Sequence, residues 1–135
     1  MRLPDLKASL IMDVSLYPGQ RTSGSVGAIL GDWVDLENSV GPVYGLFVNG
    51  VASGSGTFSQ AHICKLQEAD DNSGTGVQDV DGSAVSLSAD KDCAIFRGIR
   101  TKRYVRAVLT TGFVGGTTAP VNDLSAAVFA EARSF

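Results

Sequence analysis

Short apolar runs alternate along this chain with polar, glycine-rich segments. The strongest run is VYGLFVN, residues 43–49, which is apolar at positions pointing to either side of a strand. Such a strand is normally covered on both faces, so the pattern predicts a strand in the middle of a sandwich and not one in a sheet that faces water. The GVASGSG segment that follows is predicted to be a turn.

Two further runs have the alternation of a half-buried strand, because neighbouring side chains of a strand point to opposite faces. In TFSQAHICKL, residues 57–66, one face carries Phe58, His62, Cys64 and Leu66, and the other carries Ala61 and Ile63. In TKRYVRAVLTTG, residues 101–112, one face carries Val105, Ala107 and Leu109, and the other carries Tyr104, Arg106, Val108 and Thr110.

Shorter runs complete the strand pattern. Strands are predicted within residues 26–36, at AVSL (84–87) and at CAIFRGI (93–99), with a long polar connection over residues 68–82. The last run, LSAAVFAEARSF, is ambiguous from local signals. Asp123 would cap an alanine-rich helix, whereas Val128 and Phe129 favour a strand.

The first 24 residues have little periodicity. Leu10, Ile11 and Met12 form a brief apolar patch, and Pro18 and Gly19 follow it. We interpret residues 1–24 as an arm or edge segment, with a disordered terminus as the alternative, because a stretch without alternation does not specify a sheet register. Residues 25–135 are expected to form one domain.

The composition fits that single domain. A chain of 135 residues with 44% hydrophobic and 19% charged residues is long and apolar enough to bury a core. Its 16 glycines lie mainly in the polar clusters between the runs, where turns require them. Some seven short strands and no strongly amphipathic helix predict an all-β fold: a single antiparallel β-sandwich, jelly-roll-like, with an irregular N-terminal arm.

The net charge of −3 argues against nucleic acid and against an anionic membrane surface as partners, since both need a basic footprint. No apolar run approaches the roughly 18 residues of a membrane span. Pro4 and Asp5 lie where a secretion signal would be apolar. The chain is therefore expected to be made and kept in a cytoplasm.

Residues capable of catalysis are few. His62 is the only histidine, and it is expected to be a buried or half-buried imidazole with a satisfied hydrogen bond; chemistry shared with Cys64 is the alternative. Cys64 and Cys93 are expected to be reduced, buried thiols, with one disulfide as the alternative. The phosphate-loop, nucleophile-elbow and zinc-helix motifs are missing, so neither enzyme activity nor a cofactor is expected.

Acidic residues gather between residues 68 and 92, where DDNSG and DVDG bring several oxygen atoms together. Neither segment completes the calcium-binding loop of an EF-hand. We expect these side chains to cap their own turns, with a bound calcium ion as the alternative.

Basic residues gather just after this acidic segment. Five of the chain's eleven lie within ten positions: Arg97, Arg100, Lys102, Arg103 and Arg106. They can pair within the chain with the acidic segment, or between chains with a partner, where they would fix orientation more than affinity. The sequence does not decide between pairing within the chain and pairing with a partner chain.

These segments carry a resemblance. CKLQEADDNSGTGVQDVDG (64–82), then IFRGIRTKRYVRAVLTTG (95–112), a Gly/Thr/Pro loop and a final small-residue strand resemble the small capsid decoration, or cement, proteins of tailed double-stranded DNA bacteriophages. That family has an LQESDDG strand and turn followed by a GTKRYVRV strand. The resemblance covers about residues 33–130. It departs from the pattern at Arg100, where the family has glycine before the threonine.

The resemblance implies a virion structural protein on the outer surface of an icosahedral head. Its partners would be the major capsid protein and copies of itself, in a trimer, with the basic cluster and Leu10, Ile11 and Met12 as interface candidates. It also implies that the last segment is a strand. A tail or neck component and a small ligand- or glycan-binding sandwich are the alternatives.

Overall fold

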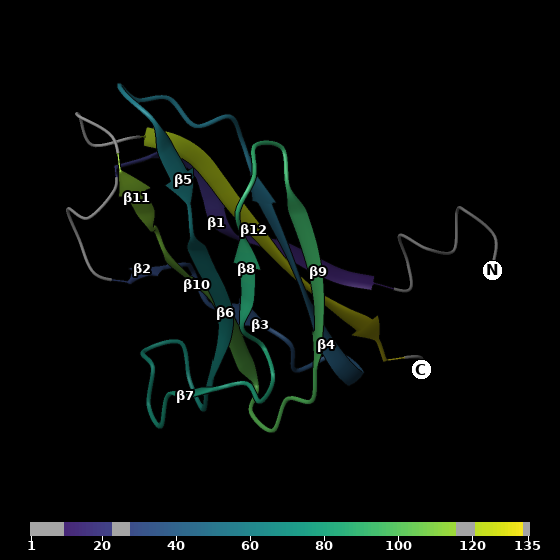
Figure 1. Cartoon of the computed structure of the whole chain (residues 1–135). Helices are drawn as coiled ribbons and strands as arrows, with labels where there is room; N and C mark the ends of the chain where they lie inside the picture. The colour runs from purple at the N-terminus through teal and green to yellow at the C-terminus, as the bar shows by residue number, and fades with distance from the viewer. Residues whose placement is uncertain (1–9, 23–27, 116–120, 134–135) are drawn as a thin grey trace, which may run out of the picture.

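The computed structural model describes residues 10–22, 28–115 and 121–133, and every regular element in them is a β-strand. Four strands form one sheet in the order β1 (Leu10–Thr22), β12 (Val121–Ala132), β4 (Ser39–Asn49) and β9 (Cys93–Gly98). All their pairings are antiparallel. Figure 1 shows β4 and β9 side by side at one border of this sheet.

A six-stranded sheet faces it. Its order is β2 (Ile29–Leu30), β10 (Tyr104–Thr110), β6 (His62–Ala69) and β7 (Gln78–Asp79), with β3 (Val34–Asp35) also on β10 and β8 (Val85–Leu87) also on β6. A small third sheet joins β5 (Phe58–Gln60) to β11 (Phe113–Gly115). The predicted all-β antiparallel sandwich is confirmed.

The strand order is that of a jelly roll. β2 and β3 pair with the same side of β10, and β7 and β8 pair with the same side of β6, so each couple acts as one interrupted strand. If each of these pairs is counted as one strand, each large sheet has four strands. The first and last strands of the chain, β1 and β12, are neighbours in one sheet. This is the double Greek-key arrangement of a jelly roll.

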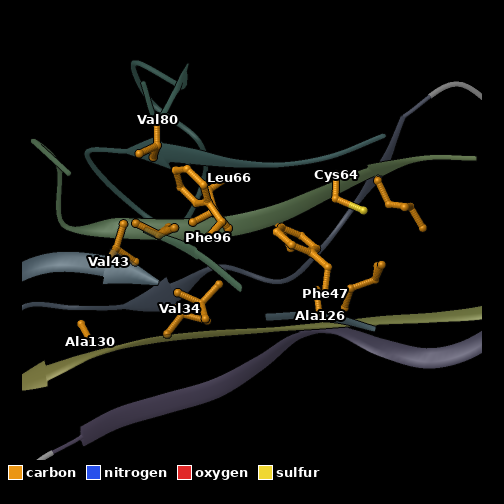
Figure 2. Packing of buried hydrophobic residues seen from close by; sticks show 14 of the residues in the cluster. Val34, Val43, Phe47, Cys64, Leu66, Val80, Phe96, Ala126 and Ala130 are labelled. Atoms are coloured by element: carbon orange, nitrogen blue, oxygen red, sulfur yellow. The ribbon is translucent and has the colours of Figure 1, made fainter. Parts of the chain in front are cut away.

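The core lies between the two large sheets. Val43, Phe47 and Val128 on one sheet are at most 2% exposed, as are Leu66 and Leu109 on the other. Figure 2 shows Phe47, Phe96 and Leu66 in the space between the yellow β12 and the strands of the opposite sheet. Gly45 lies in this layer, because a Cβ there would meet the Leu66 side chain at 3.1 Å.

The predicted alternation is confirmed for residues 62–66 and for β10. The run predicted as one strand over residues 57–66 is interrupted at Ala61, however, and Phe58 lies in β5 of the small third sheet, where it is only partly buried. His62, Cys64 and Leu66 are at most 1% exposed, whereas Ile63 between them is 51% exposed. On β10, Val105, Ala107 and Leu109 are buried as expected. Val108, predicted on the opposite face, is also buried, at 2% exposed.

Other expectations need correction. The segment 68–82 is not a continuous polar connection, because β6 continues to Ala69, Glu68 is buried, and β7 follows. The last run, which local signals leave ambiguous, forms β12, so the strand that the resemblance implies is confirmed. Residues 10–22 form the border strand β1, whose pairing with β12 is broken at two register shifts. The expected boundary at residues 24–25 falls outside the described residues.

Candidate functional site

The face of the four-stranded sheet that points away from the core is apolar in its middle rows, between Asp123 and Glu131 near the two ends of β12. The strand register aligns its side chains in rows: Met12, Phe129, Tyr44 and Arg97 in one, and Val14, Ala127, Leu46 and Ile95 in the next. Ser125, Val48 and Cys93 form a third row. We call these residues the outer face.

The exposed fractions of its side chains show that this face is unusually apolar for a sheet face that does not pack on the core. Met12 and Ile95, at opposite borders of the sheet, are 64% and 67% exposed, and Val48 is 39% exposed. Tyr44 and Phe129 stack on one another with ring centres 5.1 Å apart. An antiparallel sheet normally turns polar side chains toward water on the face that does not pack on the core. Here the open face carries one charged side chain in its two main rows, Arg97.

The outer face corrects the expectation for residues 43–49. β4 has neighbours on both sides within its sheet, and its inner face is buried. Its other face, with Tyr44, Leu46 and Val48, is only partly covered in the described part of the chain. The sequence has the pattern of a strand buried on both faces, but the structure covers one of them. A shallow hollow of about 160 Å³ lies on the open side, lined by residues that include Val14, Pro18 and Leu46.

The apolar patch of the N-terminal segment is divided between two environments. Ile11 is partly buried and packs against the core cluster, and Leu10 is also partly buried. Met12 belongs to the outer face. Of the three interface candidates predicted there, Met12 is therefore the one that the structure places on an open surface.

Most side chains of the basic cluster form hydrogen bonds or ion pairs with groups of the same chain. Arg103 forms two hydrogen bonds of 2.8 Å to the Asp35 carboxylate and an ion pair of 2.8 Å with Glu37. Hydrogen bonding to the Arg103 guanidinium lowers the pKa of Asp35 to about 2. Lys102 forms an ion pair of 3.3 Å with Asp70. Lys102 therefore pairs with the acidic segment, as the intramolecular alternative states, whereas Arg103 pairs within the chain but with carboxylates outside residues 68–92.

Two more residues of the basic cluster contact backbone carbonyls or an aromatic ring of the same chain. The Arg100 guanidinium donates to the carbonyls of Leu36, Ser39 and Lys102 and to the Ser39 hydroxyl. Arg106 lies over the Trp33 ring. Arg97 is exposed on the outer face and has no hydrogen bond or ion pair with the described residues.

Glu68 organises the start of the basic strand, and sequence reasoning missed it. Its carboxylate accepts hydrogen bonds from the Thr101 N–H and hydroxyl at 2.7 Å, from the Lys102 N–H at 3.2 Å and from the Gln78 amide at 2.7 Å. Burial raises the pKa of Glu68, but these hydrogen bonds outweigh it and the net pKa is lowered. One sequence signal could have indicated that Glu68 is buried: it lies on the same strand face as His62, Cys64 and Leu66.

His62 is structural in the described part of the chain. It is 0% exposed, and its ring meets Phe113 edge-on at 4.8 Å. The Gly112 N–H donates to Nδ1 at 3.3 Å, so Nε2 carries the proton and donates to Gln60 at 3.0 Å. Desolvation lowers the pKa of His62. The expectation of a buried imidazole with satisfied hydrogen bonds is confirmed.

The cysteines differ in burial, and the acidic segment bonds to its own turn. Cys64 and Cys93 are both free thiols; Cys64 is buried, which raises its pKa to about 12, but Cys93 is exposed, so its expected burial is wrong. Asp71 accepts hydrogen bonds from the N–H groups of Ser73 and Thr75, which is the predicted capping of its own turn. No group of three or more metal-ligating side chains is found within residues 10–22, 28–115 and 121–133. The same ranges contain no helix long and apolar enough to cross a membrane.

Comparison with known proteins gives structural likeness only. No protein-family model matches the chain, and no curated protein sequence matches it. One similar solved structure comes from the disulfide-linked pili of Bacillus endospore appendages, with 13% identity, a TM-score of 0.43, and coverage of 93% of this chain and 90% of that one. A chain of infectious bursal disease virus, strain Gt, has 11% identity and a TM-score of 0.45 over 90% of this chain.

A third likeness is to T=1 particles derived from infectious bursal virus, with 11% identity, a TM-score of 0.43 and coverage of 93% of this chain. The chain spans only 33% and 36% of the two viral chains. The neighbours thus include viral capsid and pilus proteins. Identities and TM-scores this low carry no argument about what this chain does.

Proposed function

We propose that this chain is a virion structural protein that decorates the outside of an icosahedral bacteriophage head and binds the major capsid protein through its outer face. The observation that carries the proposal is the apolar outer face itself. A soluble protein that leaves Met12, Val14, Leu46 and Ile95 on one open sheet face gains free energy when another surface covers them. Full burial of one such side chain is worth about 1.5–3 kcal/mol.

The charge of the chain supports an exterior position. The net charge is −3, and four of the five clustered basic residues are held by groups of the same chain. Little positive charge is left for contact with packaged DNA, so an inner position against phosphate is disfavoured. The resemblance of residues 64–82 and 95–112 to decoration proteins supports the same position.

The mechanism would be mechanical. Each copy that covers a junction between capsid subunits adds a modest interface, and the shell repeats that junction many times. Anything that binds the assembled state in preference to the dissociated one stabilises it by mass action. Reinforcement of the shell against internal pressure follows without any reaction chemistry in the chain. The trimer implied by the resemblance stays a prediction.

The decisive experiment is quantitative mass spectrometry of purified particles of the virus that carries this gene. Hundreds of copies per particle are expected for a decoration protein. A dozen copies or fewer would assign the chain to the neck or tail, and its absence from particles would overturn a virion role.

Matched variants then test the surface. Met12→Lys places a charge on the outer face, and Ile63→Lys places the same charge on the opposite sheet, where Ile63 is 51% exposed. We expect Met12→Lys to lose binding to particles stripped of the wild-type protein, and Ile63→Lys to retain it. Retention by both variants at wild-type copy number would show that the outer face is not the contact. Circular dichroism of both variants verifies that they are folded.

A further inference from the structure

β9 is a border strand that the fold leaves open. In the described residues its one strand partner is β4, which pairs with it over Cys93–Gly98 without a register shift. A border strand presents a row of unpaired N–H and C=O groups to any strand that approaches. Proteins usually blunt such borders with short strands, bulges, proline or charge.

The other borders of the two large sheets are blunted in these ways. β1, at the far border of the same sheet, has two register breaks and contains Pro18. The Val14 N–H of that strand is also bonded to the Asp13 carboxylate at 2.9 Å. The six-stranded sheet ends on both sides in strands of two or three residues. β9 has six residues, no proline and no bulge, and Arg97 is its one charged side chain.

The side chains of β9 favour a particular partner. Ile95, in the middle of the strand, is 67% exposed. Before the strand, Asp90 and Asp92 flank Lys91, so this segment has a net charge of −1. Toward the end of the strand, Arg97 carries a positive charge. A second β9 that approaches antiparallel brings the acidic end of one copy to the basic end of the other, whereas a parallel approach sets like charges against each other. The strand is therefore complementary to itself about a two-fold axis.

We propose that two copies of this chain join β9 to β9 in antiparallel fashion, with the two-fold axis at Ile95. The two four-stranded sheets then continue as one sheet across the interface, by the strand addition that open borders permit. In this register Ile95 packs against Ile95 of the partner subunit. Arg97, which lacks a partner in the described residues, comes opposite Cys93 of the partner subunit, one residue from the Asp92 carboxylate.

This contact does not depend on the proposed function, and it differs from the trimer that the resemblance implies. It would place two outer faces side by side as one larger apolar surface. Because Met12 lies at the opposite border of the sheet, a change there leaves the β9 contact intact. Failure of the pairing and failure of capsid binding can therefore be told apart.

Light scattering coupled to size-exclusion chromatography tests the pairing. The wild-type chain is expected to elute with twice the 14.0 kDa mass of one copy, and Met12→Lys is expected to do the same. Ile95→Lys sets two positive charges against each other on the axis and is expected to elute as a monomer. A wild-type monomer or trimer, or an unchanged dimer in a folded Ile95→Lys variant, would overturn the proposal.

Cysteine cross-linking gives a second test that does not require a disruptive change. In a Cys93→Ser background, Ile95→Cys places one thiol at the axis, where cross-strand Cβ atoms are about 4.5–5.5 Å apart and a disulfide is within reach. Mild oxidation is expected to convert most of this variant to a covalent dimer and little of a Met12→Cys control. Equal cross-linking of the two variants would contradict a two-fold contact at Ile95.

Discussion

The guanidinium carbon of Arg106 lies 4.3 Å from the centre of the Trp33 ring. The same guanidinium donates to the Gln67 side-chain carbonyl, with distances of 3.2 Å from Nε and 2.9 Å from Nη2. Arg106 thus connects β10 both to its neighbour β6 and to the segment before β3. A residue that looks from the sequence like part of a basic binding patch acts here as a stabilising contact.

Replacing Arg106 with methionine should lower the free energy of unfolding by about 0.5–2 kcal/mol, the range of a cation–π contact from exposed to desolvated. Methionine keeps much of the aliphatic stem and removes the charge. Trp33 is the only tryptophan, so its fluorescence should change in the folded variant and report the unfolding transition in urea. Arg133→Met, at an exposed position, is the control. Equal stability of the two variants would show that the contact contributes nothing.

Glu68→Gln should destabilise the fold more strongly than a surface substitution. Hydrogen bonds to charged groups contribute about 1.5–3 kcal/mol, and an amide at this position would turn a donor toward the N–H groups of Thr101 or Lys102. We expect a loss of about 2 kcal/mol in urea unfolding at pH 7. Glu131→Gln, on the exposed end of β12, should change stability by less than about 0.5 kcal/mol. A similar small change at Glu68 would contradict the role assigned to its carboxylate.

Strand alternation made much of the fold predictable. The buried faces of residues 62–66 and 105–109 follow directly from it, because every second side chain in each run is apolar or, at His62, aromatic. β1 could not be predicted in the same way. Its two register shifts break the alternation, and the strand is specified by pairing with β12, whose residues lie 99 to 121 positions away in sequence. β12 itself needed tertiary context, since its alanines suit a helix or a closely packed strand.

The candidate surface was only partly predictable. The sequence of residues 43–49 indicates a strand covered on both sides, but no sequence pattern says whether the second cover comes from the same chain. The basic cluster stood out in sequence, yet Arg100 and Arg103 bond to Ser39 and Asp35, more than sixty positions away. Such long-range partners are invisible to local patterns. Glu68 was hidden for a related reason, because it lies next to acidic turn residues and looks like one of them.

Stability should fall as the pH is lowered from 7 to 5, because of His62. In the folded chain the pKa of His62 lies below its ordinary value of 6.5. Above that pH the imidazole is neutral in the folded and in the unfolded chain, so the full stability is present there. Below pH 6.5 the unfolded chain binds a proton that the folded chain does not, and stability declines by up to about 1.4 kcal/mol per pH unit. His62 is the only histidine, so the slope in this window should largely disappear in His62→Gln. Urea unfolding at pH 7, 6 and 5 measures both slopes, and a flat wild-type profile would refute the assignment.

Ser15 should prove essential to the way β1 joins the two sheets. It lies at the first register shift of β1, between Val14 and Leu16, and is 1% exposed. Its hydroxyl donates to the Asp32 carbonyl at 2.7 Å and accepts from the Ala107 N–H at 2.8 Å. Ser15→Ala removes both bonds and leaves a buried N–H on β10 without a partner, which costs about 1–3 kcal/mol.

Gly31 gives an independent check of the same junction. A Cβ there would lie 2.5 Å from the Ser15 hydroxyl oxygen and 2.9 Å from the Ala107 carbonyl oxygen, so Gly31→Ala must displace one of the two strands. Both variants should unfold at lower urea concentration than wild type, whereas Ser59→Ala, on an exposed position of β5, should not. If Ser15→Ala matched Ser59→Ala in stability, β1 would be held by its pairing with β12 alone.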